Sequence, residues 1–62
     1  MLHTSHKKKI LIISNYYWTI YNFREALIKY LIKNNFEVYT LAKNDEYLKR
    51  VELLGCKTFK LK

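Results

Sequence analysis

The chain has 62 residues, a formal net charge of +7 and a single cysteine. This length accommodates one domain at most, and the lone cysteine excludes an internal disulfide and fits a reducing compartment. Half of the residues are hydrophobic, which excludes a disordered polar chain, while no apolar run approaches the ~20 residues of a membrane span. We therefore expect a small folded protein of the cytoplasm.

The positive charge is concentrated at the two ends of the sequence. Lys7, Lys8 and Lys9 precede the first apolar run, and three lysines lie among residues 57–62, whereas residues 10–56 contain six basic and five acidic side chains. A nucleic-acid interface concentrates Lys and Arg on one element, so this distribution predicts no nucleic-acid partner. The lysines and aromatic residues leave one alternative open, which is peripheral contact with an anionic membrane.

Residues 1–7 show no hydrophobic period, and we expect them to form a flexible tail. His3 and His6 have no third ligand nearby, so no metal site is predicted. The first strand is expected over residues 9–14. Residues 10–13 are all apolar, which is typical of a strand covered on both faces in the interior of a parallel sheet.

A helix is expected to begin near Asn22 and to end at Asn34 and Asn35. Asn22 and Glu25 have the spacing of a capping box, and Asn tolerates the left-handed conformation at helix ends better than most non-glycine residues. Apolar side chains recur here at helical spacing and are predicted to face the sheet: Phe23, Leu27, Tyr30 and Leu31.

A second strand is predicted over residues 36–41, followed by a turn and a short helix for which Asn44 or Asp45 supplies the N-cap. Gly55 is placed as the C-cap of this helix, and a third strand follows over residues 57–61. The second helix has a narrow apolar stripe, formed by Leu48, Val51 and Leu54.

The predicted order is therefore strand, helix, strand, helix, strand. Such a β-α-β-α-β unit has the α/β fold class, with three parallel strands and two helices, and it forms half of a Rossmann-like domain. Right-handed crossovers place both helices on one face if the strands follow one another across the sheet. The other face and one edge of the first strand then lack cover, so we expect self-association or a further protein part that covers them.

Polar and aromatic residues follow the first strand, at the carboxyl end where open parallel sheets bind ligands. Asn15, Tyr16, Trp18 and Thr19 stand there without a glycine-rich phosphate motif, which argues against a dinucleotide site. Amide, hydroxyl and aromatic groups together suit a sugar, because its hydroxyls need hydrogen bonds and its C–H faces stack on rings. The alternative is that Tyr16, Tyr17 and Trp18 simply cover the end of the sheet.

The charged and nucleophilic residues leave their roles open. Arg24 suits either an anionic ligand or an ion pair with Glu25, Asp45 or Glu46. Asp45 and Glu46 suit either an acceptor hydroxyl or the positive N-terminus of a helix. Cys56 has no histidine near it in the sequence, which favours a buried structural cysteine over a nucleophile. No catalytic residue is identified.

Five short motifs are distinctive: KILIIS at residues 9–14, IYNFR at 20–24, FEV at 36–38, NDEY at 44–47 and LGCK at 54–57. With them, residues 8–61 resemble the N-terminus of bacterial GT-B-fold glycosyltransferases of the family 4 type. These enzymes build capsule, lipopolysaccharide and lipid-linked glycans. Asn35 departs from the resemblance, because many members have glycine before the second strand.

The resemblance implies that residues 8–62 form part of an N-terminal, acceptor-side domain. A missing C-terminal domain would bind the nucleotide-sugar donor, so the chain alone is expected to need no cofactor and to be inactive. The implied acceptor is a glycan or lipid-linked glycan, and the implied location is the cytoplasm or the periphery of the inner membrane. An alternative is a small basic interaction module for a separate partner chain or the membrane surface. The candidate substrate-binding residues are Asn15, Tyr16, Trp18, Thr19, Tyr21, Asn22, Arg24, Asn44, Asp45 and Glu46.

Overall fold

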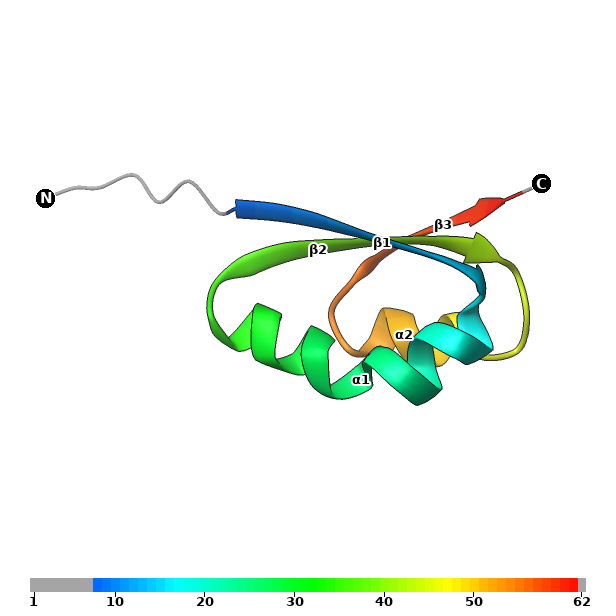
Figure 1. Ribbon diagram of the computed structural model, residues 1–62, viewed down its shortest axis with the longest axis horizontal. Helices are drawn as coiled ribbons and strands as arrows, with labels where there is room; N and C mark the ends of the chain where they lie inside the picture. Colours follow the sequence, from blue (N-terminus) through cyan, green and yellow to red (C-terminus); the bar gives the residue numbers. More distant parts are fainter. Residues whose placement is uncertain (1–7, 62) are drawn as a thin grey trace, which may run out of the picture.

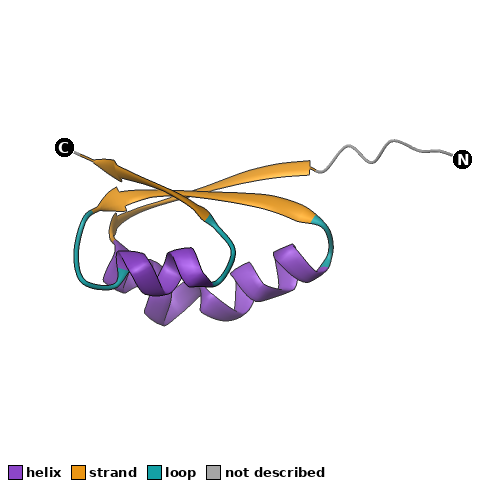
Figure 2. Cartoon of the chain, turned by 180° about the vertical axis from the view of Figure 1, so that it is seen from behind, coloured by secondary structure: helices purple, strands orange, loops and turns teal. Residues whose placement is uncertain are grey.

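The computed structural model describes residues 8–61, so the tail predicted over residues 1–7 lies outside the described residues. The elements follow in the order β1 (Lys8–Tyr16), α1 (Tyr17–Lys33), β2 (Phe36–Lys43), α2 (Leu48–Leu53) and β3 (Lys57–Leu61). The three strands form one parallel sheet in the order β1-β2-β3, and both helices lie on the same face of it (Figure 1, Figure 2). The predicted β-α-β-α-β unit is therefore confirmed.

The first two strands are longer than predicted, and β1 is irregular near its end. The register between β1 and β2 shifts between Ile13 and Tyr16, since three steps along β1 there match two steps along β2. Such a bulge bends the strand and re-aims the residues that follow it. The chain then enters α1 directly, without the loop that was predicted between the first strand and the first helix.

The start of α1 at Tyr17 corrects the prediction that the helix begins near Asn22. Asn22 lies inside the helix, where its Nδ2 donates a hydrogen bond to the Trp18 carbonyl oxygen at 2.8 Å. The N-cap position belongs to Tyr16, which has an extended backbone and no capping side-chain bond. The predicted helix end is confirmed, because Asn34 is the C-cap and Asn35 adopts a φ of 68°.

The buried stripe of α1 also differs from the predicted one. Of the predicted core residues only Leu31 is buried, whereas Phe23, Leu27 and Tyr30 are 63%, 45% and 62% exposed. The earlier start of the helix explains the difference, because Tyr17 and Ile20, which precede the predicted start, set the face that packs on the sheet. The side chains that α1 buries are Tyr17, Ile20, Ile28 and Leu31.

The core lies between the two helices and the face of the sheet that they cover. β2, the central strand, buries Val38, Thr40 and Ala42, which alternate along it and so point to the helix side. Leu48 and Val51 of α2 join them, as predicted. Leu54 is the C-cap of α2, and Gly55, predicted at that position, follows it with a φ of 109°, the left-handed conformation that ends the helix.

Tyr17 connects α1 to two strands. Its ring is fully buried, and its hydroxyl accepts a hydrogen bond from the Phe59 N–H at 3.0 Å. The carbonyl oxygens of Thr40 and Phe59 lie 3.0 Å and 2.7 Å from the same hydroxyl, so either can accept its proton. Thr40, also fully buried, donates to the Lys57 carbonyl oxygen at 3.2 Å. The first residue of the helix thus fixes the position of α1 against β2 and β3.

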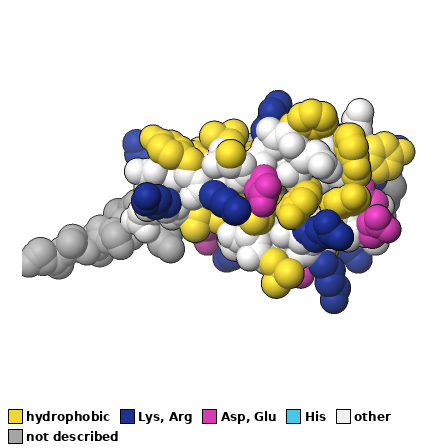
Figure 3. Space-filling view, turned by 90° about the horizontal axis from the view of Figure 1, so that it is seen from below, with side chains coloured by type: hydrophobic (Ala, Val, Ile, Leu, Met, Phe, Trp, Pro, Cys, Tyr) yellow, Lys and Arg dark blue, Asp and Glu magenta, His cyan; other side chains and the backbone are white. Residues whose placement is uncertain are grey.

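The face of the sheet opposite the helices is open within residues 8–61. Large apolar side chains of β1 and β3 are exposed there, and Ile13 reaches 63%. The helix side carries exposed apolar side chains as well, and these lie among Lys and Arg side chains in Figure 3. The exposed large apolar residues of α1 and α2 are Trp18, Phe23, Leu27, Tyr30 and Leu53.

We expect Tyr17→Phe to lower the free energy of unfolding by about 1–3 kcal/mol, because it leaves the part-buried Phe59 N–H without this acceptor and removes a buried hydroxyl contact to Thr40. Urea denaturation followed by circular dichroism measures the change. Tyr30→Phe is the matched control, since the Tyr30 side chain is 62% exposed, and it should change stability by less than about 0.5 kcal/mol. Equal effects of the two substitutions would show that the Tyr17 hydroxyl does not connect the helix to the strands.

We expect Cys56 to react slowly with thiol reagents. The side chain is 6% exposed, and burial raises the pKa of its thiol from 9.0 to about 11. Because the thiolate is the reactive form, its fraction at pH 8 falls about a hundredfold. Modification rates measured with a disulfide reagent in buffer and in denaturant should differ by at least that factor. Similar rates in the two conditions would contradict burial of Cys56.

Candidate functional site

The junction between β1 and α1 meets the loop between β2 and α2 at the carboxyl edge of the sheet. The Trp18 backbone N–H donates a hydrogen bond to Asp45 Oδ2 at 3.0 Å. Asp45 Oδ1 accepts a second bond, from the Tyr47 N–H at 2.8 Å. One carboxylate therefore joins the two segments in which the sequence places the candidate site.

Asp45 acts as a cap for α1 from outside that helix. The first N–H groups of a helix have no partner within it, and the positive end of the helix dipole favours an anion. Trp18 is the second residue of α1, so the Asp45 carboxylate satisfies one of these groups. Asp45 also makes the bonds predicted for it at the start of the second helix, because its Oδ1 accepts from the Tyr47 N–H and its carbonyl oxygen accepts from the Leu48 N–H at 3.1 Å, although the helix itself begins later than predicted. α2 begins at Leu48, and its N-cap position, Tyr47, has no capping side-chain bond.

The two accepted backbone bonds favour a structural role for Asp45 over that of an acceptor-binding base. Both carboxylate oxygens are already hydrogen-bonded. Glu46, the neighbouring acid, is exposed. Of the two acids that the sequence offers for an acceptor hydroxyl, Glu46 is the one whose side chain faces solvent.

Flat aromatic surface is exposed beside this junction. Trp18 is 46% exposed, and its ring lies edge to face with Phe23 at a centroid distance of 5.8 Å. Tyr16 is 47% exposed, and Lys43 Nζ lies 5.5 Å from the centroid of its ring. The side chains of Asn15 and Asn44 are also exposed, whereas Thr19 is half-buried. Lys43 is a site residue that was not predicted from the sequence, although as the last residue of β2 it had to lie at this edge.

Tyr21 lies in a second cluster, between α1 and the segment that leads into α2. Its ring centroid is 5.7 Å from that of Tyr47. The Arg50 guanidinium lies over both rings, with its Cζ 5.7 Å and 5.0 Å from the centroids of Tyr21 and Tyr47. Cations attract aromatic faces, so these contacts hold the two helices together. Tyr21 is half-buried here, and packing accounts for its position.

Arg24 does not reach the carboxyl edge through any contact in the described residues. It lies two turns into α1, where its Nη1 donates to the Phe23 carbonyl oxygen at 3.2 Å. The predicted ion pair with Glu25, Asp45 or Glu46 is wrong. Glu25 pairs with Lys29 at 3.3 Å instead, and Asp45 binds backbone N–H groups.

The site is an open surface. Residues 8–61 enclose no pocket, and no three of their His, Cys, Asp and Glu side chains gather to hold a metal ion. Within the same residues, no helix is both long and apolar enough to cross a membrane. Comparisons with protein-family models, curated proteins and solved structures gave no match for this chain.

We expect Asp45→Ala to lower the free energy of unfolding by about 0.5–2 kcal/mol, the usual cost of losing a helix cap. Asp45→Asn should lose less, because an amide oxygen still accepts from one N–H. Glu46→Ala is the matched control, since it removes an exposed acid from the same loop, and it should cost less than about 0.5 kcal/mol. Thermal unfolding of the three variants measures these losses of stability. A Glu46→Ala loss as large as that of Asp45→Ala would assign the effect to loop charge instead.

Proposed function

We propose that this β-α-β-α-β unit is the acceptor-side part of a glycosyltransferase with the GT-B fold, which acts together with a donor-binding domain. The observation that carries the proposal is the Trp18–Asp45 hydrogen bond, which joins the start of α1 to the loop between β2 and α2 at the carboxyl edge of the sheet. Exposed rings and amides flank that bond. The motifs through which residues 8–61 resemble family 4 enzymes give the proposal its second support.

The exposed groups at the carboxyl edge have the chemistry that a sugar acceptor requires. Tyr16 and Trp18 offer ring faces for the C–H surfaces of a sugar, and Asn15 and Asn44 offer amides for its hydroxyls. Glu46 adds an exposed carboxylate that can accept a hydrogen bond from the attacking hydroxyl.

The N-terminus of α1 favours the acceptor over the nucleotide-sugar donor. In nucleotide-binding sheets the phosphates lie at the N-terminus of the first helix, where free N–H groups and the dipole attract them. Here the Asp45 carboxylate occupies a hydrogen bond at that end and places a negative charge there. Phosphate oxygens would be repelled, so we assign the donor to another domain.

In the complete enzyme the reaction would be a retaining transfer of a sugar from a nucleotide-sugar to a glycan or lipid-linked acceptor. Such acceptors place the enzyme in the cytoplasm, at or near the inner membrane. The 62-residue chain by itself is proposed to bind acceptor and not to transfer sugar.

Trp18, the only tryptophan, reports on the test directly. We expect oligosaccharides to change its fluorescence and to shift the amide resonances of Asn15, Trp18 and Asn44, whereas nucleotide-sugars leave them unchanged. Tyr16→Ala should weaken oligosaccharide binding about 3- to 10-fold, the usual range for one aromatic contact. Tyr30→Ala is the matched control, because it removes an exposed tyrosine elsewhere on α1 and should have no effect.

Three results would overturn the proposal: binding of nucleotide-sugars at these residues, equal effects of Tyr16→Ala and Tyr30→Ala, or no response to any oligosaccharide. Sugar transfer by the purified 62-residue chain would refute the claim that the chain binds acceptor without transferring sugar.

A further inference from the structure

The open sheet face is defined here as the apolar side chains of the three strands that point away from the helices. The register aligns them in rows, with Leu11 beside Tyr39 and Ile13 beside Leu41, which is itself beside Phe59. The side chains of β1 and β3 in this set are 39–63% exposed. The members of the open sheet face are Leu11, Ile13, Tyr39, Leu41, Phe59 and Leu61.

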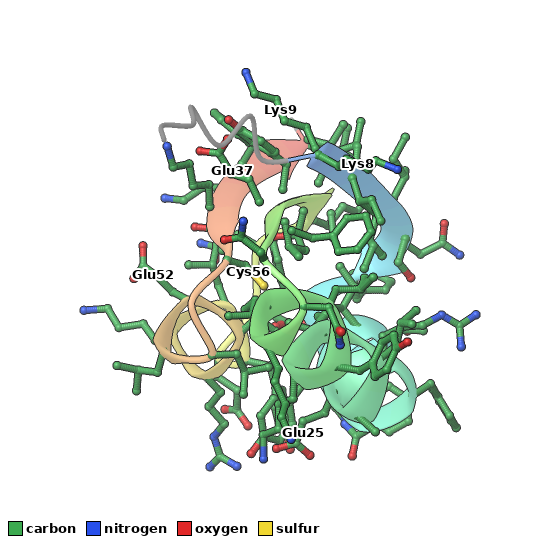
Figure 4. All side chains as sticks on the ribbon, turned by 90° about the vertical axis from the view of Figure 1, so that its left-hand side faces the viewer. Lys8, Lys9, Glu25, Glu37, Glu52 and Cys56 are labelled. Atoms are coloured by element: carbon green, nitrogen blue, oxygen red, sulfur yellow. The ribbon has the colours of Figure 1, made fainter. Side chains whose placement is uncertain are left out.

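Lysines stand at both ends of this apolar strip. The amino end has Lys9, which is paired in register with Glu37 and points away from the helices in Figure 4. The negative charge of Glu37 is already balanced there. The Lys57 ammonium lies 3.1 Å from its carboxylate and lowers the pKa of that group, which keeps it ionised. The carboxyl end has Lys43, in register with Leu61. By register, three lysines and one glutamate of the strands lie on this side of the sheet, namely Lys9, Lys43, Lys57 and Glu37, so the surroundings of the strip are basic.

We propose that the open sheet face binds an amphipathic helix of a partner, with an apolar stripe and acidic residues at both ends of that stripe. Three strands about 4.8 Å apart span about 10 Å, which is the width of one helix. Parallel sheets are normally covered by helices on both faces, and residues 8–61 cover only one face. The acidic ends match Lys9 at one end and Lys43 at the other, since Lys57 is already paired with Glu37.

The spacing of the lysines sets the length of the helix. The rows of Lys9 and Lys43 are separated by the stretch of β2 from Glu37, which is in register with Lys9, to Lys43. Six steps along this strand extend about 20 Å, and a helix of about 13 residues has that length, so a peptide of about 15 residues reaches both lysines. The proposal concerns the face of the sheet and shares only Lys43 with its carboxyl edge, so it does not rest on the proposed function.

Charge argues against a second copy of this chain as the occupant. Two open sheet faces packed together would bring the lysines of both copies to one interface, where the one acid of each face is already paired. The width of the strip argues against a membrane, because lipid does not select a surface one helix wide. Both alternatives are outcomes of the test below.

The test uses the 62-residue chain and two synthetic peptides of about 15 residues that share one Leu/Ala stripe. One peptide has Glu at both ends of the stripe, and the other has Lys at the same positions. Amide NMR titration should show the Glu peptide shifting Leu11, Ile13 and Phe59, and binding at least about tenfold more tightly than the Lys peptide, which corresponds to two or three favourable charge contacts.

Variants separate the apolar and the charged contributions. Ile13→Thr should weaken binding of the Glu peptide about 5- to 10-fold, while Leu27→Gln, which removes an exposed leucine from α1, should leave it unchanged. Lys43→Glu should weaken the Glu peptide about 3- to 5-fold and strengthen the Lys peptide. This reversal depends on charge at the open sheet face and would not follow from loss of folding.

Equal affinity for the two peptides, or equal effects of Ile13→Thr and Leu27→Gln, would overturn the proposal. Concentration-dependent shifts of Leu11 and Ile13 without peptide would overturn it in favour of a second copy. Capture by anionic vesicles, lost in Ile13→Thr and accompanied by no peptide binding, would overturn it in favour of a membrane.

Discussion

The position of α1 depends on one buried hydroxyl. Tyr17 directly follows the bulged end of β1, and its side chain crosses the core to the line where β2 and β3 meet. The hydroxyl binds the backbone of β3 and lies against Thr40, so a single residue links the first helix to the last strand. With this end of the helix fixed, the later turns can bury Ile28 and Leu31 against the sheet, and Trp18 lies within reach of Asp45.

The sequence was sufficient for the element order and insufficient for the start of the first helix. Strands of β-branched and aromatic residues, the paired asparagines at 34 and 35, and Gly55 each act locally, so they could be recognised from neighbouring residues alone. The start of α1 was missed because its cap is not local. Asp45 supplies the bond from far along the chain, and no capping residue stands at Tyr16 to signal it. The error then propagated to the buried stripe, since its residues were counted from Phe23.

The position of the candidate site could be predicted from the sequence, but the roles of its residues could not. Asn15, Tyr16, Trp18 and Asn44 follow parallel strands, and such segments always meet at one edge of the sheet. The positions of Arg24 and Tyr21 were harder to predict, because they depend on where along α1 each residue lies. Asp45 illustrates the limit, since its carboxylate can serve a ligand or a helix, and only the three-dimensional contacts show that it accepts from two backbone N–H groups.

The one-sided cover of the sheet connects the fold to its partners. Both crossovers are helical, so α1 and α2 must lie on the same face once the strands follow the order β1-β2-β3. The opposite face then presents apolar side chains that have no helix to pack against within residues 8–61, and lysines rather than acids stand around them. An apolar strip bordered by lysines selects a partner by the sign of its charge as well as by its hydrophobicity. A partner helix with acidic ends gains from burial of apolar surface and from charge attraction. Another copy of the chain gains only from the burial and is opposed by repulsion between the lysines.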